Sequence, residues 1–224
     1  IPWDALQADV VIDATGRFLT REKLARHLES GAKRVFLTRN PKNNIDRYVI
    51  PGINESSISA SDKIISTTSS TTQVLALMVK MLDEAFGLQR AMMTTVHAYT
   101  ADQPLADAAG ADLRRSRSAV ENIIPNTTKA PDLVKKIMPQ YKGKIEGIAF
   151  NVPVPNGSCV DLTTELERMP TIEEANQAIK SFSEGDLDGI VGYTSDPIVS
   201  SDVSGREETC LLYTSPSPRD SDSS

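Results

Sequence analysis

The chain has 224 residues, of which 39% are hydrophobic, and 24 basic against 30 acidic side chains give it a formal net charge of −6. This length and apolar content suit one large or two smaller globular domains and exclude a fibrous or wholly disordered chain. The acidic balance, without a long basic run, gives no indication of a nucleic-acid or anionic-membrane partner.

The chain contains only two cysteines, Cys159 and Cys210. Two are too few for a disulfide framework or a cysteine-rich metal site, so we expect no metal centre and a reducing, cytoplasmic compartment. No uninterrupted apolar run approaches the roughly 20 residues that a membrane span needs, so no membrane partner is expected.

The first 66 residues have the pattern of a partial dinucleotide-binding domain. Residues 8–16 read as an apolar strand that ends in a Thr15-Gly16 turn, and a helix follows from the N-cap Thr20 to Gly31. Residues 33–38 predict a second buried strand, which completes a βαβ unit of about 30 residues. We therefore expect part of a Rossmann-type parallel sheet, with ligands at the carboxyl ends of its strands.

Residues 67–208 alternate long strands with fewer helices, as in an α+β domain with a mixed or antiparallel sheet. A helix begins within residues 69–72 and ends at Gly87, and its apolar residues recur at helical spacing: Val74, Leu77, Met78, Met81, Leu82 and Ala85. Further strands are predicted at 91–100, 146–155 and 158–166, and helices at 131–140 and 171–185. Residues 101–128 have little periodicity, which indicates a functional or interface loop.

The two ends of the sequence call for separate treatment. The chain begins at Ile1 without a methionine, so we expect a preceding portion. From about residue 210 the letters CLLYTSPSPRD resemble the translation of a sequencing adapter, and a Ser/Pro-rich disordered tail is the alternative. We therefore set residues 209–224 apart as a non-native or disordered tail.

Several collinear motifs resemble the glyceraldehyde-3-phosphate dehydrogenase family from Trp3 to about Gly205. They are ATGRF, GAKRV, PGIN, MTTVHAYTADQ, DLRRSR, NIIPNTT, KGKIEGIAFNVPVPNGSCVDL and SSDVSG. The resemblance implies an NAD(P)-dependent oxidoreductase that acts on a small phosphorylated aldehyde with inorganic phosphate, working as a homo-oligomer, a tetramer in the family.

The resemblance also locates the nucleophile, where this sequence departs from the family. The family's SNASCTTN stretch corresponds to residues 66–73, so Ser70 takes the place of the catalytic cysteine, and an engineered replacement would give the same letter. His97 follows 27 positions later (97 minus 70), which matches the family's spacing between nucleophile and histidine. A thiol at a helix N-terminus beside an imidazole is readily ionised. If a serine hydroxyl is taken to resemble water, its pKa lies far above the value of about 8.5 for a free thiol, and forming the anion needs roughly 10 kcal/mol more.

Further resemblances concern phosphate binding. Gln73 replaces an asparagine, Lys129 replaces a glycine of the inorganic-phosphate site, and Asn151 replaces an arginine of the substrate-phosphate site. Residues that match family phosphate-site or neighbouring positions are Ser69, Thr71, Thr100, Asp102, Arg114, Arg117 and Thr128. Lys129 is one candidate for restoring the charge lost at Asn151. Arg114, Arg115 and Arg117 are equally consistent with solvated or intersubunit ion pairs.

The resemblance assigns the cofactor to Thr15, Gly16 and Phe18. No G-x-G-x-x-G fingerprint occurs in the 224 residues, and we expect it in the preceding portion, together with the acidic residue that separates NAD from NADP. Cys159 lies in a predicted core strand, which favours a buried, inert thiol over a relocated nucleophile.

Three functions remain open at this point. The first is the aldehyde oxidoreductase, slowed by its serine. The second is a catalytically silent paralogue that serves as a binding or regulatory subunit and pairs through the loop after His97. The third is an esterase-like hydrolase built on Ser70 and His97, for which the sequence does not identify the carboxylate that orients the histidine in serine hydrolases.

Overall fold

The computed structural model describes residues 1–213, which form two four-stranded sheets and a smaller two-stranded one. The first part contains β1 (Val10–Asp13), α1 (Arg21–Glu29), β2 (Arg34–Leu37), β3 (Arg47–Tyr48) and β4 (Ile64–Ser66). The second contains α2 (Ser70–Phe86), β5 (Leu88–Ala98), β6 (Ile124–Asn126), α3 (Ala130–Ile137), β7 (Ile145–Val152), β8 (Cys159–Leu166), α4 (Ile172–Ser183), β9 (Val191–Thr194) and β10 (Cys210–Tyr213). Short 3₁₀ turns lie at Glu55–Ser57, Pro139–Tyr141 and Ser200–Val203.

The first sheet has the order β1-β2-β4-β3, and all three of its strand pairs are parallel. Helix α1 begins as predicted, because the Thr20 side chain accepts a hydrogen bond from the amide of Lys23. The carboxyl ends of β1, β2 and β4 lie side by side at one edge, since β2 stands between the other two. This edge is where a doubly wound sheet binds its ligands.

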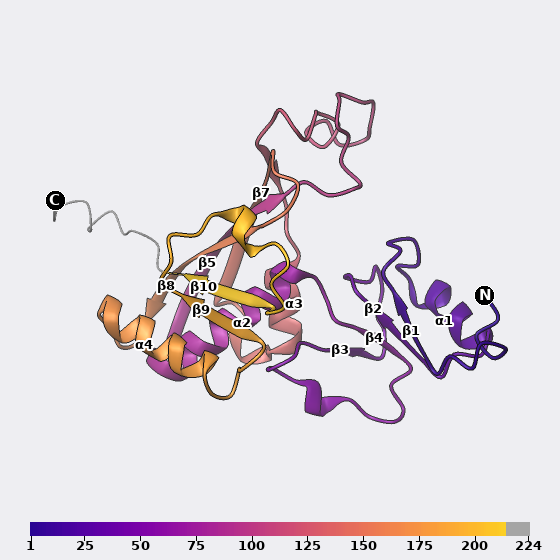
Figure 1. Ribbon diagram of the computed structural model, residues 1–224, viewed down its shortest axis with the longest axis horizontal. Helices are drawn as coiled ribbons and strands as arrows, with labels where there is room; N and C mark the ends of the chain where they lie inside the picture. The colour runs from indigo at the N-terminus through magenta and orange to yellow at the C-terminus, as the bar shows by residue number, and fades with distance from the viewer. Residues whose placement is uncertain (214–224) are drawn as a thin grey trace.

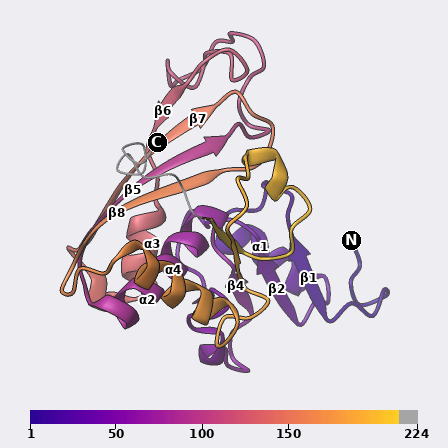
Figure 2. The same cartoon turned by 60° about the vertical axis from the view of Figure 1, so that its left-hand side comes forward.

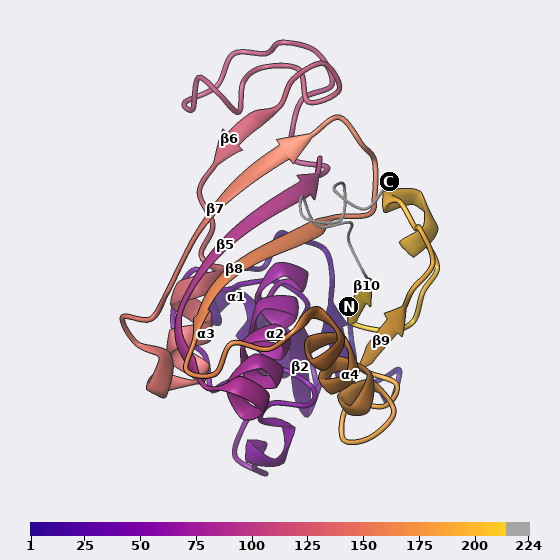
Figure 3. The same ribbon diagram turned by 90° about the vertical axis from the view of Figure 1, so that its left-hand side faces the viewer.

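The second sheet is mixed, in the order β6-β7-β5-β8. Strand β5 pairs parallel with β7 and antiparallel with β8, and β6 pairs antiparallel with β7 (Figure 3). The predicted α/β part followed by an α+β part with a mixed sheet is therefore confirmed. Residues 101–123 form a long loop that extends away from the rest of the molecule (Figure 1). The expected loop ends earlier than 128, because β6 is formed there.

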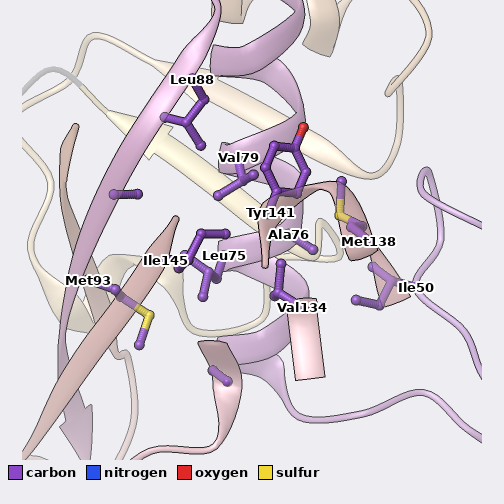
Figure 4. Close-up of a cluster of buried hydrophobic side chains, with 12 residues drawn as sticks. Ile50, Leu75, Ala76, Val79, Leu88, Met93, Val134, Met138, Tyr141 and Ile145 are labelled. Carbon is purple, nitrogen blue, oxygen red and sulfur yellow. The ribbon is translucent and has the colours of Figure 1, made fainter. Parts of the chain in front are cut away.

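Helices α2 and α3 cover one face of the second sheet. Apolar side chains from α2, α3, β5 and β7 meet in a buried cluster (Figure 4), which includes Leu75, Ala76, Val79, Leu88, Met93, Val134 and Ile145. Tyr141 closes this cluster, and its hydroxyl donates to Asp83 Oδ2 at 2.6 Å. Helix α2 ends at Gly87, with φ +72°, a conformation that glycine adopts without strain.

Among the described residues 1–213, no helix lies over the opposite face of the second sheet (Figure 2). Its side chains alternate with the buried ones, and three apolar residues there are at least 38% exposed: Met92, Val96 and Ile148. Side chains on the helix-covered face are shielded from solvent, so we look for a binding site on that side of the sheet.

The end of the described chain differs from expectation. Residues Cys210–Tyr213 form β10, which pairs parallel with β9, and Cys210 is buried against α2 residues. The disordered alternative is therefore wrong for Cys210–Tyr213, and the non-native alternative stays a prediction. The remaining tail, 214–224, lies outside the described residues.

Candidate functional site

Ser70 is the first residue of α2, and a short turn joins it to the carboxyl end of β4 at Ser66. The helix N-cap is Ser69, whose Oγ accepts from the amide of Thr72 at 3.3 Å and lies 2.8 Å from the Thr72 hydroxyl. The helix cap is therefore Ser69, and Ser70 is free of that structural role. Within residues 1–213, the exposed Ser70 side chain makes no hydrogen bond, so its hydroxyl is available to a ligand.

A constrained turn delivers Ser70 to this position. Thr68 is buried with φ +65°, a left-handed conformation that is uncommon for a β-branched residue. The Gln73 side-chain amide reaches back and donates to the carbonyl of Thr67 at 2.5 Å. Gln73 thus fixes the turn and uses its amide for structure rather than for a ligand.

Ser70, Thr71 and Thr95 line one side of a cavity of about 620 Å³. Its other walls come from β8, β10 and the turn at Ser200–Val203. The backbone amides of Ser70 and Thr71 have no hydrogen-bond partner in the described chain, as is usual for the first turn of a helix. Together with the dipole of a 17-residue helix, they favour an anion beside Ser70.

His97 lies near the end of β5, on the sheet face that α2 and α3 cover. This follows from strand alternation, because Met93 and Thr95 share its side and are buried. His97 Nδ1 is 2.7 Å from the carbonyl oxygen of Ala98. A carbonyl only accepts hydrogen bonds, so Nδ1 carries the proton and Nε2 is left as the basic nitrogen.

No hydrogen bond joins Ser70 to His97 anywhere in residues 1–213. Both belong to the α2 side of the sheet, and Thr95, two residues before His97 on the same face, lines the cavity with Ser70. Contact between Ser70 and His97, direct or through one water, stays a prediction.

Asn151 is the register partner of His97 across β5 and β7, so both side chains lie on the same face. It is 8% exposed. Its Oδ1 accepts from Asn126 Nδ2 at 3.0 Å, and its own Nδ2 donates to the Ala98 carbonyl at 3.3 Å. Asn151 therefore holds the carbonyl that orients His97, instead of presenting a cation as an arginine would.

Thr100 and Asp102 form a polar pair in the loop after β5. The Thr100 hydroxyl donates to Asp102, and Arg115 Nη2 lies 2.6 Å from Asp102 Oδ2. Burial alone would raise the pKa of Asp102, but the Thr100 hydrogen bond and the charges of Arg115 and Arg39 lower it on balance. Asp102 is therefore ionised at neutral pH.

The other predicted phosphate residues are spread over the long loop and the start of α3. Arg117 Nε lies 2.9 Å from Asp107 Oδ2 with both side chains exposed, which matches the solvated ion-pair interpretation. Arg114 is exposed. Thr128 Oγ1 accepts from the amide of Ala130 at 3.2 Å, and Lys129 is exposed at the N-cap of α3. Within residues 1–213 none of these four residues makes a hydrogen bond to Ser70 or lines its cavity, so their part in phosphate binding stays a prediction.

The Thr15-Gly16 turn follows the carboxyl end of β1, and the buried Asp13 organises it. Asp13 Oδ1 accepts from the amide and the hydroxyl of Thr15, at 2.9 and 2.8 Å. Asp13 Oδ2 lies 3.2 Å from His27 Nε2, and the Trp3 indole donates to His27 Nδ1 at 3.1 Å. Because the indole occupies Nδ1, His27 donates to Asp13 through Nε2.

Phe18 packs edge-on against His27 with a centroid distance of 5.3 Å. Phe18, the third predicted cofactor residue, therefore contacts the same histidine that is hydrogen-bonded to Asp13 below the Thr15-Gly16 turn. Asp13 was not among the predicted site residues. A carboxylate at the end of an apolar run was the signal that could have found it, because a buried charge needs hydrogen-bond partners nearby.

Cys159 is half-buried rather than buried in the core, and it lines the cavity. It pairs with Val96 across β5 and β8, so its side chain lies on the face opposite to His97. The prediction of a buried core thiol is therefore wrong, and the same register separates this thiol from the face that carries His97.

Comparison with known proteins gives the ancestry of this arrangement. The family described as "Glyceraldehyde 3-phosphate dehydrogenase, C-terminal domain" matches residues 69–217. "Glyceraldehyde-3-phosphate dehydrogenase 2" of Streptomyces avermitilis is 45% identical over 213 residues, which are 95% of this chain and 63% of that protein. "Glyceraldehyde-3-phosphate dehydrogenase" of Geobacillus stearothermophilus is 46% identical over 206 residues, 92% of this chain and 61% of that protein.

The chain thus spans less than two thirds of the length of these relatives. Within residues 1–213, no helix has the length and apolar character to cross a membrane. The family match extends over the Ser70 helix, the mixed sheet and the cavity between them. The chain therefore belongs to the glyceraldehyde-3-phosphate dehydrogenase family.

Proposed function

We propose that the whole protein is a phosphorylating aldehyde oxidoreductase of this family, with Ser70 in the nucleophile's place and with slow turnover. Its substrates are a small phosphorylated aldehyde, of the kind named in its relatives, and inorganic phosphate. The observation that carries the proposal is the position of Ser70. Its hydroxyl stands at the first turn of α2, open to a cavity of about 620 Å³ and free of structural hydrogen bonds within residues 1–213.

The chemistry assigned to the residues begins with bond formation. Ser70 Oγ attacks the aldehyde carbon, and His97 Nε2 takes the hydroxyl proton. The free amides of Ser70 and Thr71 stabilise the negative charge that develops on the aldehyde oxygen. Loss of hydride then leaves an ester on Ser70. Phosphate attacks the ester carbon and forms an acyl phosphate, while the bond to Ser70 Oγ breaks and the serine oxygen takes back its proton from His97.

The residues at the β1 end fit a nicotinamide cofactor. Gly16 has φ +69°, and the turn that it forms is fixed by the buried Asp13, so the absence of a Cβ lets another group come close to the backbone at the sheet edge. Thr15, Gly16 and Phe18 would hold NAD or NADP there. When bound, the cofactor accepts the hydride that the aldehyde carbon loses.

The serine sets the expected rate. Forming the alkoxide costs roughly 10 kcal/mol more than forming a thiolate. His97 offsets part of this cost as a general base, but its orienting partner is the neutral Ala98 carbonyl rather than a carboxylate. For the same reason the arrangement supports an esterase-like hydrolase less well than the inherited dehydrogenase chemistry.

A catalytically silent binding or regulatory subunit is the second candidate. The observation that favours it is Asn151, which stands where the family has a substrate-phosphate arginine and whose amide oxygen and nitrogen are hydrogen-bonded to Asn126 and Ala98. In either case we propose a cytoplasmic homo-oligomer, a tetramer as in the family. The uncovered apolar face of the second sheet, with Met92, Val96 and Ile148, supports association.

The test is steady-state nicotinamide reduction by the full-length protein with glyceraldehyde 3-phosphate and phosphate. We expect Ser70→Cys to raise kcat/KM at least about 100-fold over wild type, because a thiolate forms far more easily than an alkoxide. This increase corresponds to lowering the activation free energy by about 2.7 kcal/mol. Ser70→Ala is the matched control and gives the background rate.

Each outcome separates the candidates. A Ser70→Cys variant no faster than Ser70→Ala would show that this is not a nucleophile site and would favour the silent subunit. Rapid turnover by wild type would instead refute the argument from hydroxyl acidity. Ester hydrolysis that disappears in Ser70→Ala would favour the hydrolase.

A further inference from the structure

Arg39 lies at the ligand-binding edge of the first sheet, two residues after the end of β2. Because β2 stands between β1 and β4, Arg39 lies between the Thr15-Gly16 turn and the segment that leads to Ser70. Its backbone is fixed on the β4 side, where the Ser66 hydroxyl donates to the Arg39 carbonyl at 2.8 Å. The residue is thus anchored at the centre of this edge.

The guanidinium group of Arg39 reaches over the turn at the end of β1. A Cβ added to Gly16 would lie only 2.7 Å from Arg39 Nη1. The side chain is nevertheless exposed, and it makes no hydrogen bond or ion pair within residues 1–213. A cation held over a glycine turn, with its donors free, is suited to a ligand anion.

Two buried polar atoms without partners belong to the segments on either side, one next to Arg39 in sequence and one next to Asp102, whose carboxylate feels the charge of Arg39. In the described chain these atoms are Asn40 Oδ1, next to Arg39 in sequence, and Gln103 Nε2, next to Asp102. Gln103 is only 6% exposed, so its amide proton is kept from bulk water. The charge of Arg39 also acts on the Asp102 carboxylate, which places the two loops near one another. Unpaired buried polar atoms beside a free cation are typical of a binding site.

We propose that Arg39 is an anion-binding residue of this site, which contacts a phosphate group of a ligand lying across the carboxyl edge of the first sheet. Arg39 offers a ligand a positive charge, whereas Asn151, bound to Asn126 and Ala98 in the second sheet, offers none. The phosphate belongs either to the dinucleotide or to the phosphorylated aldehyde. This inference deepens the proposed function and rests on it for the choice of ligands.

The test is calorimetric titration of the full chain with three probes: inorganic pyrophosphate, NAD and glyceraldehyde 3-phosphate. We expect Arg39→Gln to weaken binding of pyrophosphate and of at least one of the other two by about 10-fold or more, the range of a lost charged hydrogen bond. Arg39→Lys keeps the charge but loses the planar fork of the guanidinium group. Its affinity for the probes should therefore fall between those of wild type and of Arg39→Gln. Weaker NAD binding assigns the phosphate to the dinucleotide, and weaker aldehyde binding assigns it to the substrate.

Arg90→Gln is the matched control, because it removes the same exposed charge near the start of β5, at the far end of that strand from His97. The proposal is overturned if Arg39→Gln binds all three probes within twofold of wild type, if Arg90→Gln weakens them equally, or if wild type binds none of them. Arg39-dependent pyrophosphate binding in a protein whose Ser70→Cys variant reduces no nicotinamide would sink the proposed function and leave this inference standing.

Discussion

Asn151 shows how one substitution gives a position a new role, because the asparagine makes hydrogen bonds of its own within the sheet. An arginine in its place would present a cation, whereas the asparagine bridges Asn126 and the Ala98 carbonyl. That carbonyl also accepts from His97, so the substitution joins three strands into one polar network. The position has become part of the support of the histidine.

Replacing Asn151 with leucine should destabilise the fold. The change leaves the Asn126 amide without its acceptor in a partly buried position, so we expect a loss of about 1–3 kcal/mol in the free energy of unfolding. Urea denaturation measures it as a lower midpoint at an unchanged slope. Asn156→Leu, at an exposed site, should stay within about 0.5 kcal/mol of wild type, and equal losses in both variants would contradict the network.

At the scale of single residues, the sequence predicted which residues belong to the candidate site better than it predicted which residues they contact. The resemblance to the family marked Ser70 and His97, because their separation of 27 positions (97 minus 70) matches the family's spacing between nucleophile and histidine. Arg39 was not found, because its place between two ligand loops depends on the strand order β1-β2-β4-β3. A single sequence does not state which strands are neighbours.

Helix α2 divides its first two serines between structure and chemistry. Ser69 caps the helix through Thr72, while Ser70 faces the cavity. We expect Ser69→Ala to cost about 1 kcal/mol of unfolding free energy, as the loss of an N-cap usually does. Ser70→Ala should change it by less than about 0.5 kcal/mol.

Thermal or urea denaturation of the two alanine variants gives this comparison directly. A Ser70→Ala variant as unstable as Ser69→Ala would mean that both hydroxyls support the helix, and the assignment of Ser70 to a ligand would lose its basis. The sequence placed the helix start within a run of hydroxyl residues. It did not separate cap from first turn, because serine and threonine both suit either position.

The elements themselves were largely predictable, since apolar runs and helical periodicity reflect burial on one side of a strand or helix. The exceptions have local causes. Strand β6 is only three residues long and contains Pro125, so it lacks any alternating pattern. Cys159 was misplaced because strand register, and not composition, decides which face a residue occupies.

For the whole molecule, the one-sided covering of the second sheet predicts association. We expect Met92→Lys to weaken self-association at least tenfold, because it places a charge on the apolar face that a second copy would bury. Sedimentation velocity over a concentration series measures the change. Met169→Lys is the control, since Met169 is 92% exposed and lies outside the strands. If Met92→Lys self-associates as strongly as wild type, this face is not the interface.

The hydrogen bond from Trp3 to His27 has a practical consequence for spectroscopy. Trp3 is the only tryptophan in the sequence, and through His27 and Asp13 it is joined to the turn at Thr15. Its fluorescence therefore reports on the first sheet alone, while tyrosines such as Tyr141 emit from the second. Local unfolding near the carboxyl end of β1 can thus be measured by tryptophan fluorescence without an added label, and separately from changes around Ser70.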